Sequence, residues 1–292
     1  MNRPLIALAT GALAATMLTG CATATPPSGT TTGPGSPTTS QAPTTWSISG
    51  PLVTLVTPGT LTVCTNPPFK PMEFKDNSGV VVGFDLDIMQ LVADKLGVTM
   101  TAIETDFAQI TSGAVFAAKK CDIGASSITI TDARKKALTF SAPYFSATQA
   151  LAAPTASGIK SLADLKGKKV GVQTDTTGAD YANAHAAENG YDVVVFEDGG
   201  TALNAILAGT VDATLIDLPV VADFVASNQG MGIATQFQTG ELYGFAMGQD
   251  ANSKVLAALV NLVLATADAD GTYLKTYQKW IDSTATSVAL PS

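Results

Sequence analysis

From about residue 60 onward, short apolar runs alternate with segments in which apolar side chains recur every three or four positions. Leu61–Thr65 predicts a strand, and the prolines within residues 66–71 end it. Residues 84–96 have helical spacing and are followed by Gly97 at the position of a C-cap. The same criteria predict a helix at residues 107–119 between strands at residues 98–103 and 121–123. This β-α-β-α-β order predicts a parallel sheet with binding groups at the carboxyl ends of its strands.

The alternation resumes after residue 153. Strands are expected at residues 169–173, 192–197 and 211–217, and helices at residues 161–167, from 177 to about 189, at 201–208 and from Pro219. Two α/β units in one chain, each with polar residues after its strands, predict two lobes that face a cleft. Two final helices, at about residues 253–267 and 272–281, are expected to pack on the first lobe.

The stretch that carries most chemistry is Gly124–Arg134, which reads as a strand end, a turn of small hydroxyl residues and a helix with Asp132 in its first turn. Open backbone N–H groups and hydroxyls can hold the oxygens of an organic carboxylate, and the Arg134 guanidinium can grip them in a bidentate fork. The same residues also fit a plain Ser/Thr turn, a helix cap and an arginine on the surface. The stretch alone leaves both interpretations open.

The first fifty residues differ from the rest. Residues 5–18 are a mostly apolar run after Arg3, short for a membrane span and typical of a signal peptide. The following Leu18–Cys21 is similar to the lipobox of bacterial lipoproteins, which implies removal of residues 1–20 and a lipid on Cys21 that anchors the protein at the extracytoplasmic face of the cell membrane. An ordinary secretory signal with a chance cysteine is the alternative. Residues 21–50, rich in Thr, Pro, Ser and Gly, are expected to form a flexible tether.

Composition narrows the function classes. The chain of 292 residues is 46% hydrophobic and 14% charged, which is enough for one large or two medium domains. Its formal net charge of −8 argues against a nucleic-acid partner, because no basic surface would neutralise phosphates. Asp85 and Asp87 suggest a metal only superficially, since the start of a helix accounts for both. No metal and no cofactor are expected.

Several stretches then match one family in unbroken order: residues 71–74 (PMEF), 82–87 (VGFDLD), 127–134 (SITITDAR), 140–144 (FSAPY), 162–172, 211–213, 270–273 (DGTY) and 279–280 (KW). Together they resemble the extracytoplasmic solute-binding proteins of family 3, the polar-amino-acid receptors of ABC importers. The resemblance covers about residues 58–282. It implies an α/β fold of the type II periplasmic-binding-protein kind, with two Rossmann-like lobes joined by two crossing hinge segments. The implied domains are residues 51–147 (lobe I, first part), 148–245 (lobe II) and 246–292 (return to lobe I, with the C-terminal helices).

The resemblance also implies ligand-binding residues. Arg134 would clamp the α-carboxylate of an amino acid, helped by the hydroxyls and amides around Ser127 and Thr129, and Thr177 would meet that carboxylate from the second lobe. Asp217 would pair with the α-ammonium, although on its own it could equally cap the helix that Pro219 begins. The remaining implied contacts are the aromatic walls Phe69 and Phe107, the side-chain reader Asn66, and the hydroxyl residues Ser126 and Thr176.

Two residues depart from the family pattern. Asp175 stands where the family often has glycine, which puts the local backbone and charge in question. Asn66 stands where the family frequently has aspartate, which weakens the case for a cationic ligand. An amide both donates and accepts, so the expected ligand is a polar neutral or acidic amino acid: glutamine, asparagine, glutamate or aspartate.

The implied function is a monomeric receptor that delivers an amino acid to the permease of an ABC importer, with no catalytic residues. The same binding module could instead serve as a sensor lipoprotein for a membrane signalling partner. Some dehydratases also resemble this family, but the cleft residues placed from the sequence offer no histidine or glutamate beyond those used for binding.

The cysteines complete the expectations. Lipidation of Cys21 would leave Cys64 and Cys121, whose strands are neighbours in the strand order that the resemblance implies. An oxidising compartment permits a disulfide between them, and two buried thiols are the alternative.

Overall fold

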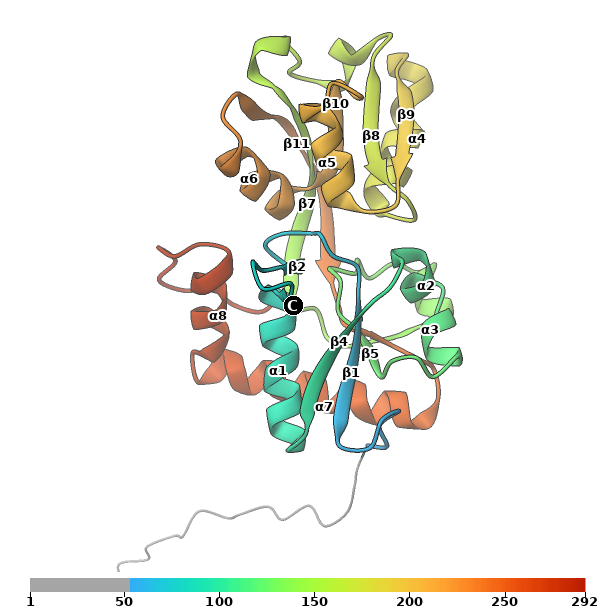
Figure 1. Ribbon diagram of the computed structural model, residues 1–292, viewed down its shortest axis with the longest axis vertical. Helices are drawn as coiled ribbons and strands as arrows, with labels where there is room; N and C mark the ends of the chain where they lie inside the picture. The colour runs from blue at the N-terminus through green and yellow to red at the C-terminus, as the bar shows by residue number, and fades with distance from the viewer. Residues whose placement is uncertain (1–52, 292) are drawn as a thin grey trace, which may run out of the picture. The chain divides into compact units, whose positions relative to one another are not determined.

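The computed structural model describes residues 53–291, which form two α/β lobes, each built around a five-stranded sheet (Figure 1). The predicted signal peptide, tether and lipidated Cys21 lie outside the described residues. Two long strands, β7 (Phe145–Pro154) and β11 (Met231–Tyr243), run antiparallel to each other between the lobes. The expected α/β fold with two lobes and two crossing segments is therefore confirmed.

Lobe I contains a mixed sheet in the order β4-β1-β5-β12-β6. Its strands are β1 (Thr60–Thr65), β4 (Thr99–Glu104), β5 (Ile123–Gly124), β6 (Thr139–Phe140) and β12 (Ala246–Met247), and a small hairpin of β2 (Phe74–Lys75) and β3 (Val81–Val82) lies beside it. Its helices are α1 (Phe84–Leu96), α2 (Phe107–Thr111), α3 (Ala114–Ala117), α7 (Ala251–Ala269) and α8 (Thr272–Trp280). The central strand β1 pairs in parallel with both β4 and β5, as the sequence predicted for the first three strands.

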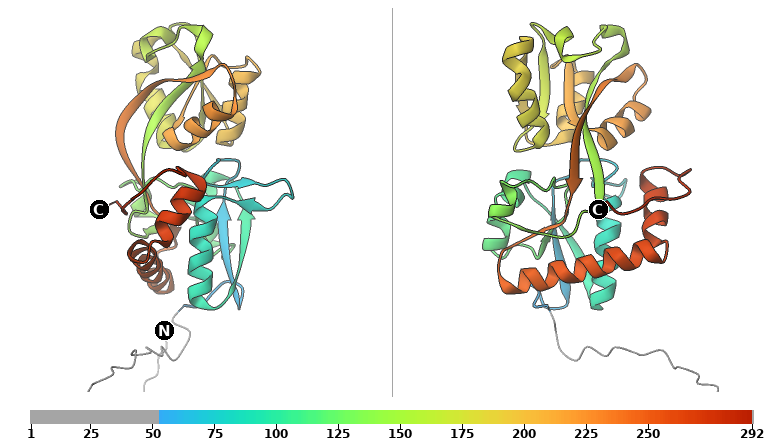
Figure 2. Two further views of the ribbon diagram at one scale, coloured as in Figure 1. Left: turned by 90° about the vertical axis from the view of Figure 1, so that its left-hand side faces the viewer. Right: turned by 180° about the vertical axis from the view of Figure 1, so that it is seen from behind.

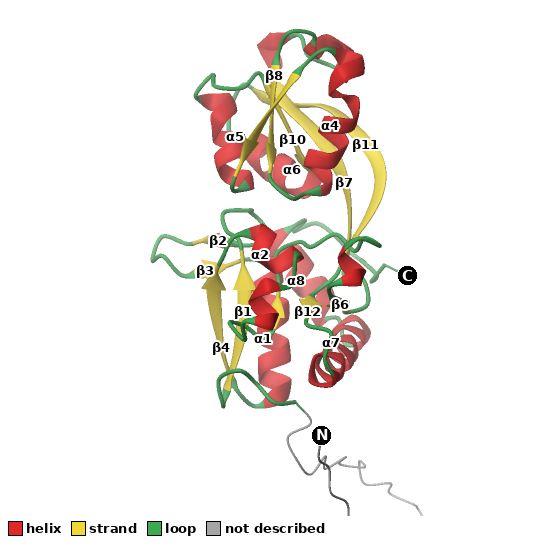
Figure 3. Ribbon diagram, turned by 90° about the vertical axis from the view of Figure 1, so that its right-hand side faces the viewer, coloured by secondary structure: helices red, strands yellow, loops and turns green. Residues whose placement is uncertain are grey.

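Lobe II contains a sheet in the order β11-β7-β10-β8-β9. Its other strands are β8 (Lys169–Gln173), β9 (Asp192–Phe196) and β10 (Ala213–Asp217), and its helices are α4 (Thr177–Asn189), α5 (Gly199–Leu207) and α6 (Leu218–Ser227). Figure 3 shows how the helices flank the strands in each lobe. Of the predicted domain boundaries, 147/148 falls inside β7 and 245/246 lies just before β12; these boundaries stay a prediction.

Helix α1 shows how the sequence builds one element. Its apolar residues form a buried face, with Phe84, Ile88 and Val92 fully inaccessible. Gly97 ends the helix in a left-handed conformation that glycine adopts without strain, and its N–H donates to Ala93 O and Asp94 O. At the other end, a Cβ on Gly83 would lie 2.1 Å from the carbonyl oxygen of Met72, so only glycine fits there.

The last two helices pack where the sequence predicted. Both α7 and α8 contact α1, which places the C-terminal region back on lobe I (Figure 2). Among the described residues, no single helix is both long and apolar enough to span a membrane; α7 and α8 reach that limit only as a pair, bent by 85° at the break between them.

Three predicted helices differ from the structure. The short helix expected at residues 161–167 is a 3-10 helix, Leu162–Leu165. The helix expected at residues 107–119 is divided into α2 and α3, because Gly113 adopts φ +81° and turns the chain between them. The helix expected after the Ser/Thr turn is only a 3-10 turn, Arg134–Lys136. Here Thr131 Oγ1 accepts the Arg134 N–H at 3.1 Å, and the chain soon extends into β6. Local turn chemistry ends the latter two helical segments early: the left-handed Gly113 in one and the hydrogen bond to the Thr131 side chain in the other.

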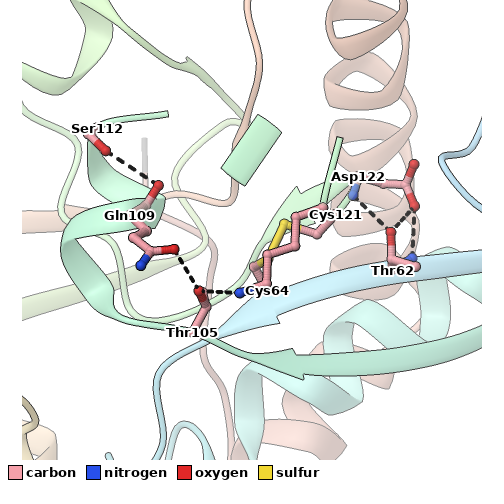
Figure 4. Close-up of a disulfide and its surroundings, with 8 residues drawn as sticks. Thr62, Cys64, Thr105, Gln109, Ser112, Cys121 and Asp122 are labelled. Atoms are coloured by element: carbon pink, nitrogen blue, oxygen red, sulfur yellow. Dashed lines mark hydrogen bonds between the residues drawn. A yellow bond between two sulfur atoms is a disulfide. The ribbon is translucent and has the colours of Figure 1, made fainter. Parts of the chain in front are cut away.

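The disulfide between Cys64 and Cys121 is present, with the two Cα atoms 5.8 Å apart (Figure 4). Cys64 lies in β1 beside β5, and Cys121 lies just ahead of β5. Next to the bridge, Asp122 Oδ2 accepts the Thr62 N–H at 2.8 Å and the Asp122 N–H donates to Thr62 Oγ1 at 3.0 Å. The disulfide therefore joins the two strands whose carboxyl ends lead to Asn66 and to the Ser/Thr turn.

Candidate functional site

All ten residues that the sequence assigned to ligand binding line one cavity between the lobes. Lobe I contributes Asn66, Phe69, Phe107, Ser126, Ser127, Thr129 and Arg134, and lobe II contributes Thr176, Thr177 and Asp217. Four further residues complete the wall: Glu73, Gln173, Gly178 and Ile216. The free volume at its centre is about 20 Å³, so an amino acid can enter only if the lobes separate or side chains move.

The Ser/Thr turn is tied to two buried acids. Ser126 Oγ donates to Glu73 Oε1 at 2.7 Å, and the Ser127 N–H donates to Asp85 Oδ2 at 2.9 Å. Ser126 Oγ also accepts the N–H of Asn66 at 3.1 Å. The expectation that the groups of this turn are open is therefore wrong for the Ser127 amide, whose proton is used inside lobe I.

Arg134 bridges the lobes. Its Nη1 donates to Thr129 O at 2.9 Å in lobe I, and its Nη2 donates to Asp175 O at 2.7 Å in lobe II. The guanidinium carbon lies 5.2 Å from the ring centre of Phe107, within cation–π range. Burial lowers the pKa of Arg134, and the negative charge of Asp217 opposes that shift. The interpretation of Arg134 as an exposed surface residue is excluded.

Asp175, where the family often has glycine, disrupts neither the local backbone nor the charge balance of the cavity. It adopts φ +55°, a left-handed conformation that glycine favours and aspartate tolerates. Its side chain is exposed, so the added charge points to solvent, while its carbonyl oxygen accepts the Arg134 bond.

The second lobe presents the N-terminus of α4 to the cavity. Thr176 is the N-cap: its Oγ1 accepts the Ala179 N–H at 3.0 Å and donates to Gln173 O at 2.8 Å. Thr177 and Gly178 begin the helix, where backbone N–H groups lack helical partners and the macrodipole favours an anion. Thr176 thus acts in the structure as a cap, and the two residues after it, at the start of the helix, line the cavity.

Asp217 stands at the N-cap position of α6, but its carboxylate makes no capping bond. It accepts hydrogen bonds from the Tyr243 hydroxyl and the Gln149 side-chain amide instead. Burial raises the pKa of Asp217 to about 7, and the nearby negative charge of Glu241 adds to the shift. The capping interpretation therefore fails for the side chain, which lines the cavity.

Sequence reasoning missed three polar residues in or behind this site. Glu73 belongs to a family-like stretch but received no role; it is 1% exposed, and burial together with the charge of Asp85 raises its pKa well above the usual range. Gln173 ends β8, and its Nε2 donates to Asn66 Oδ1 at 2.7 Å across the lobes. Glu241 lies in β11, and no local pattern singled it out. Of the three, only Gln173 could have been predicted from the sequence, because it stands at the end of an expected strand.

Burial also raises the pKa of Asp85 to about 7, although the hydrogen bonds that Tyr144 and Ser127 donate to it act to lower the pKa. Around the cavity, four buried carboxyl groups thus accompany a single guanidinium: Glu73, Asp85, Asp217 and Glu241. Among residues 53–291, no group of three or more His, Cys, Asp and Glu side chains is arranged to hold a metal ion.

The family model of the bacterial extracellular solute-binding proteins, family 3, matches residues 61–283. The chain belongs to this family. Among its relatives is the lysine/arginine/ornithine-binding periplasmic protein of Escherichia coli (strain K12), 31% identical over 236 residues, which are 77% of this chain and 88% of the relative.

Solved structures resemble this solute-binding protein as well. An ancestral arginine-binding protein bound to arginine is 39% identical with a TM-score of 0.71 and covers 76% of this chain and 98% of its own. An ancestral arginine-binding protein bound to glutamine is 39% identical with a TM-score of 0.70 and covers 77% of this chain and 98% of its own. An ancestral amino acid-binding protein described as a precursor of cyclohexadienyl dehydratase is 34% identical with a TM-score of 0.67. It covers 76% of this chain and 95% of its own.

Proposed function

We propose that this solute-binding protein is an extracytoplasmic receptor that holds a polar amino acid between its lobes and delivers it to an ABC importer. The observation that carries the proposal is the separation of charge in the cavity, with Arg134 on lobe I and Asp217 on lobe II. A zwitterion satisfies both groups only when the lobes are together. Ligand binding is thereby coupled to closure by the differential stability of the two states.

The α-carboxylate is assigned to Arg134 and to backbone amides. Thr129 faces Tyr243 of β11 at a position where the neighbouring N–H groups of Ile130 and Gly244 make the inter-strand bonds, so its own N–H points away from the strand. The first N–H groups of α4, at Thr177 and Gly178, approach from lobe II. Guanidinium, helix N-terminus and free amide together form a binding site for an organic anion.

The side-chain end of the cavity is assigned to Asn66, Gln173 and Glu73. The two amides are joined across the lobes, and Asn66 Nδ2 donates to Thr105 O at 3.0 Å, which fixes its oxygen toward Gln173. The side-chain carboxylate of an acidic ligand would add a further negative charge beside the four buried carboxyl groups, so within the expected set the neutral members, glutamine and asparagine, are favoured. The ancestral relative solved with glutamine supports an amide ligand, and the relatives that bind arginine or lysine supply the rival class.

The test is a thermal-shift screen of the full chain against the twenty amino acids, followed by calorimetry. A ligand that binds only the folded state raises the melting temperature by mass action. The proposal expects the largest shift with glutamine or asparagine. A largest shift with arginine or lysine would replace the amide assignment, and no shift with any amino acid would overturn the receptor assignment itself.

Two other functions fit parts of the molecule. A sensor lipoprotein would bind the same ligand, so deletion of the importer genes with retained signalling would identify it. A dehydratase is no longer opposed by a lack of glutamate, because Glu73 lies in the cavity with a raised pKa. Incubation with candidate substrates and analysis of products tests that function, and we propose that none is consumed.

The remaining assignments concern the N-terminus and assembly. We propose that Cys21 carries a lipid that holds the protein at the extracytoplasmic face of the membrane, and that the receptor is a monomer. Mass spectrometry of the mature N-terminus and light scattering of the detergent-solubilised protein test these two statements.

A further inference from the structure

Glu241 contacts the cavity wall from behind. It lies in β11, one of the two strands that join the lobes, and it is 7% exposed. It does not line the amino-acid cavity but a separate groove on the other side of Thr129 and Thr177. Nothing in the proposed function so far requires a carboxylate at this place.

The contacts of Glu241 are directed at one hydroxyl from each lobe. Thr129 Oγ1 donates to Glu241 Oε2 at 3.0 Å, and Thr177 Oγ1 donates to the same oxygen at 2.8 Å. The two hydroxyl oxygens lie 3.4 Å apart. Gln149 Nε2 donates to Oε1 at 3.1 Å and to Oε2 at 3.3 Å, which holds the carboxylate in this orientation.

Proton counting gives the consequence. A threonine hydroxyl has one proton and two acceptor lone pairs, and Thr129 and Thr177 each donate that proton to Glu241 Oε2. When both hydroxyl protons point to Glu241, the cavity faces only the lone pairs of Thr129 and Thr177. Lone pairs accept hydrogen bonds from an ammonium group and repel a carboxylate.

We propose that Glu241 is a positioning residue that orients these two hydroxyls as acceptors and so assigns them to the ammonium end of the ligand. The inference rests on the proposed function, since it presumes a zwitterionic ligand. It reverses the role that the sequence suggested for the hydroxyls of Thr129 and Thr177, and it leaves the carboxylate to Arg134 and the backbone amides.

The first test compares two ligands on Glu241→Gln. The substituted amide has nearly the same shape but can donate to the threonine oxygens, which frees a hydroxyl proton to face the cavity. Affinity for the best amino acid is expected to fall about tenfold, the size of a charge-assisted hydrogen bond, whereas its des-amino analogue should change by less than about twofold. Glu188→Gln, an exposed change of the same charge on α4, is the control and should alter neither affinity.

A double-mutant cycle sharpens the test. Thr129→Val removes the hydroxyl with little change in volume, so Glu241→Gln should cost less in that background than in the wild type. Equal losses for the amino acid and its analogue, or strictly additive effects, would overturn the inference while leaving the receptor function intact. If Glu241→Gln does not fold, Thr129→Val alone must still weaken the amino acid more than the analogue.

A ligand-free measurement separates this inference from the proposed function. Neutron diffraction on crystals of the protein locates the hydroxyl deuterium atoms of Thr129 and Thr177 directly. Deuterium atoms of both hydroxyls on the Glu241 side support the orientation of the hydroxyls by Glu241, even if no amino acid binds. A deuterium on the cavity side of either hydroxyl overturns it even if an amino acid binds.

Discussion

We assign one end of the cavity to Arg134, which lies near the N-terminus of α4, and to Asp217 from the end of β10. We assign the other end to Glu73, Asn66 and Gln173, which come from three distant segments and line the same cavity. The first end carries opposite charges and suits the backbone groups that every amino acid shares. The second end is rich in hydrogen-bond acceptors, and two side-chain amides there are hydrogen-bonded to each other across the lobes. From this contrast we infer that general affinity and side-chain selectivity depend on different residues, so mutations should separate the two.

The largest effect is expected from Arg134→Ala, which leaves a desolvated ligand carboxylate without its cation. Loss of such a charged partner costs about 2–5 kcal/mol, which would abolish useful binding of every amino acid alike. Calorimetry measures the loss, and the melting temperature checks the fold. Arg134→Lys keeps the charge without the fork and should lie between the wild type and alanine. Near-native affinity in the alanine variant would contradict the site assignment.

A smaller effect is expected from the titration of Asp217. Its pKa of about 7 in the ligand-free protein is raised, so an ammonium that favours the ionised form must displace a proton. Affinity should therefore fall as pH drops below about 7, by up to tenfold per pH unit, and binding should release protons. Calorimetry in two buffers of different ionisation enthalpy counts those protons.

Asp217→Asn provides the matched control for that titration. It should weaken binding at pH 8 by about 1.5–3 kcal/mol and flatten the pH dependence. Asp85, with a pKa of about 7, and Glu73, whose pKa is also raised, account for any dependence that remains. If the variant loses only thermal stability, the pairing of Asp217 with the ammonium is wrong.

Glu73→Gln acts on the selective end. At a pH high enough to ionise Glu73, removal of its negative charge should raise the affinity for glutamate relative to glutamine by about tenfold, or roughly 1.4 kcal/mol. Titrations with the two ligands at the same pH measure the ratio, and Glu104→Gln on the exposed face of lobe I serves as a charge-matched control. An unchanged ratio would show that Glu73 does not discriminate between side chains.

The smallest effect is expected from Gln173→Ala, which removes the hydrogen bond between the side-chain amides of Gln173 and Asn66 that joins the lobes. A single neutral hydrogen bond contributes about 1 kcal/mol, so affinity for an amide ligand should fall about fivefold while the fold persists. Gln90→Ala, on the exposed face of α1, is the control. A loss as large as that of Arg134→Ala would contradict the division of the cavity into a general and a selective end.

The order of the main strands and helices could be predicted from the sequence, because the spacing of apolar side chains is a local signal. It also located ten cavity residues and the Cys64–Cys121 pair, since the lining groups follow strand ends and family-like stretches. The ends of the helices were predicted less accurately. The helix expected at residues 107–119 breaks at Gly113, and the one expected after the Ser/Thr turn is a single 3-10 turn.

The hydrogen-bond partners of these groups could be found only in the folded structure. Ser126 reaches Glu73 across 53 positions, Gln173 reaches Asn66 across 107, and Glu241 meets Thr129 across 112. No periodicity or motif records such pairs, because hydrogen-bond direction depends on which atoms approach within about 3 Å after the sheets form. The direction of the Thr129 and Thr177 hydroxyls, and hence which end of a ligand they can accept, is therefore a property of the folded hinge.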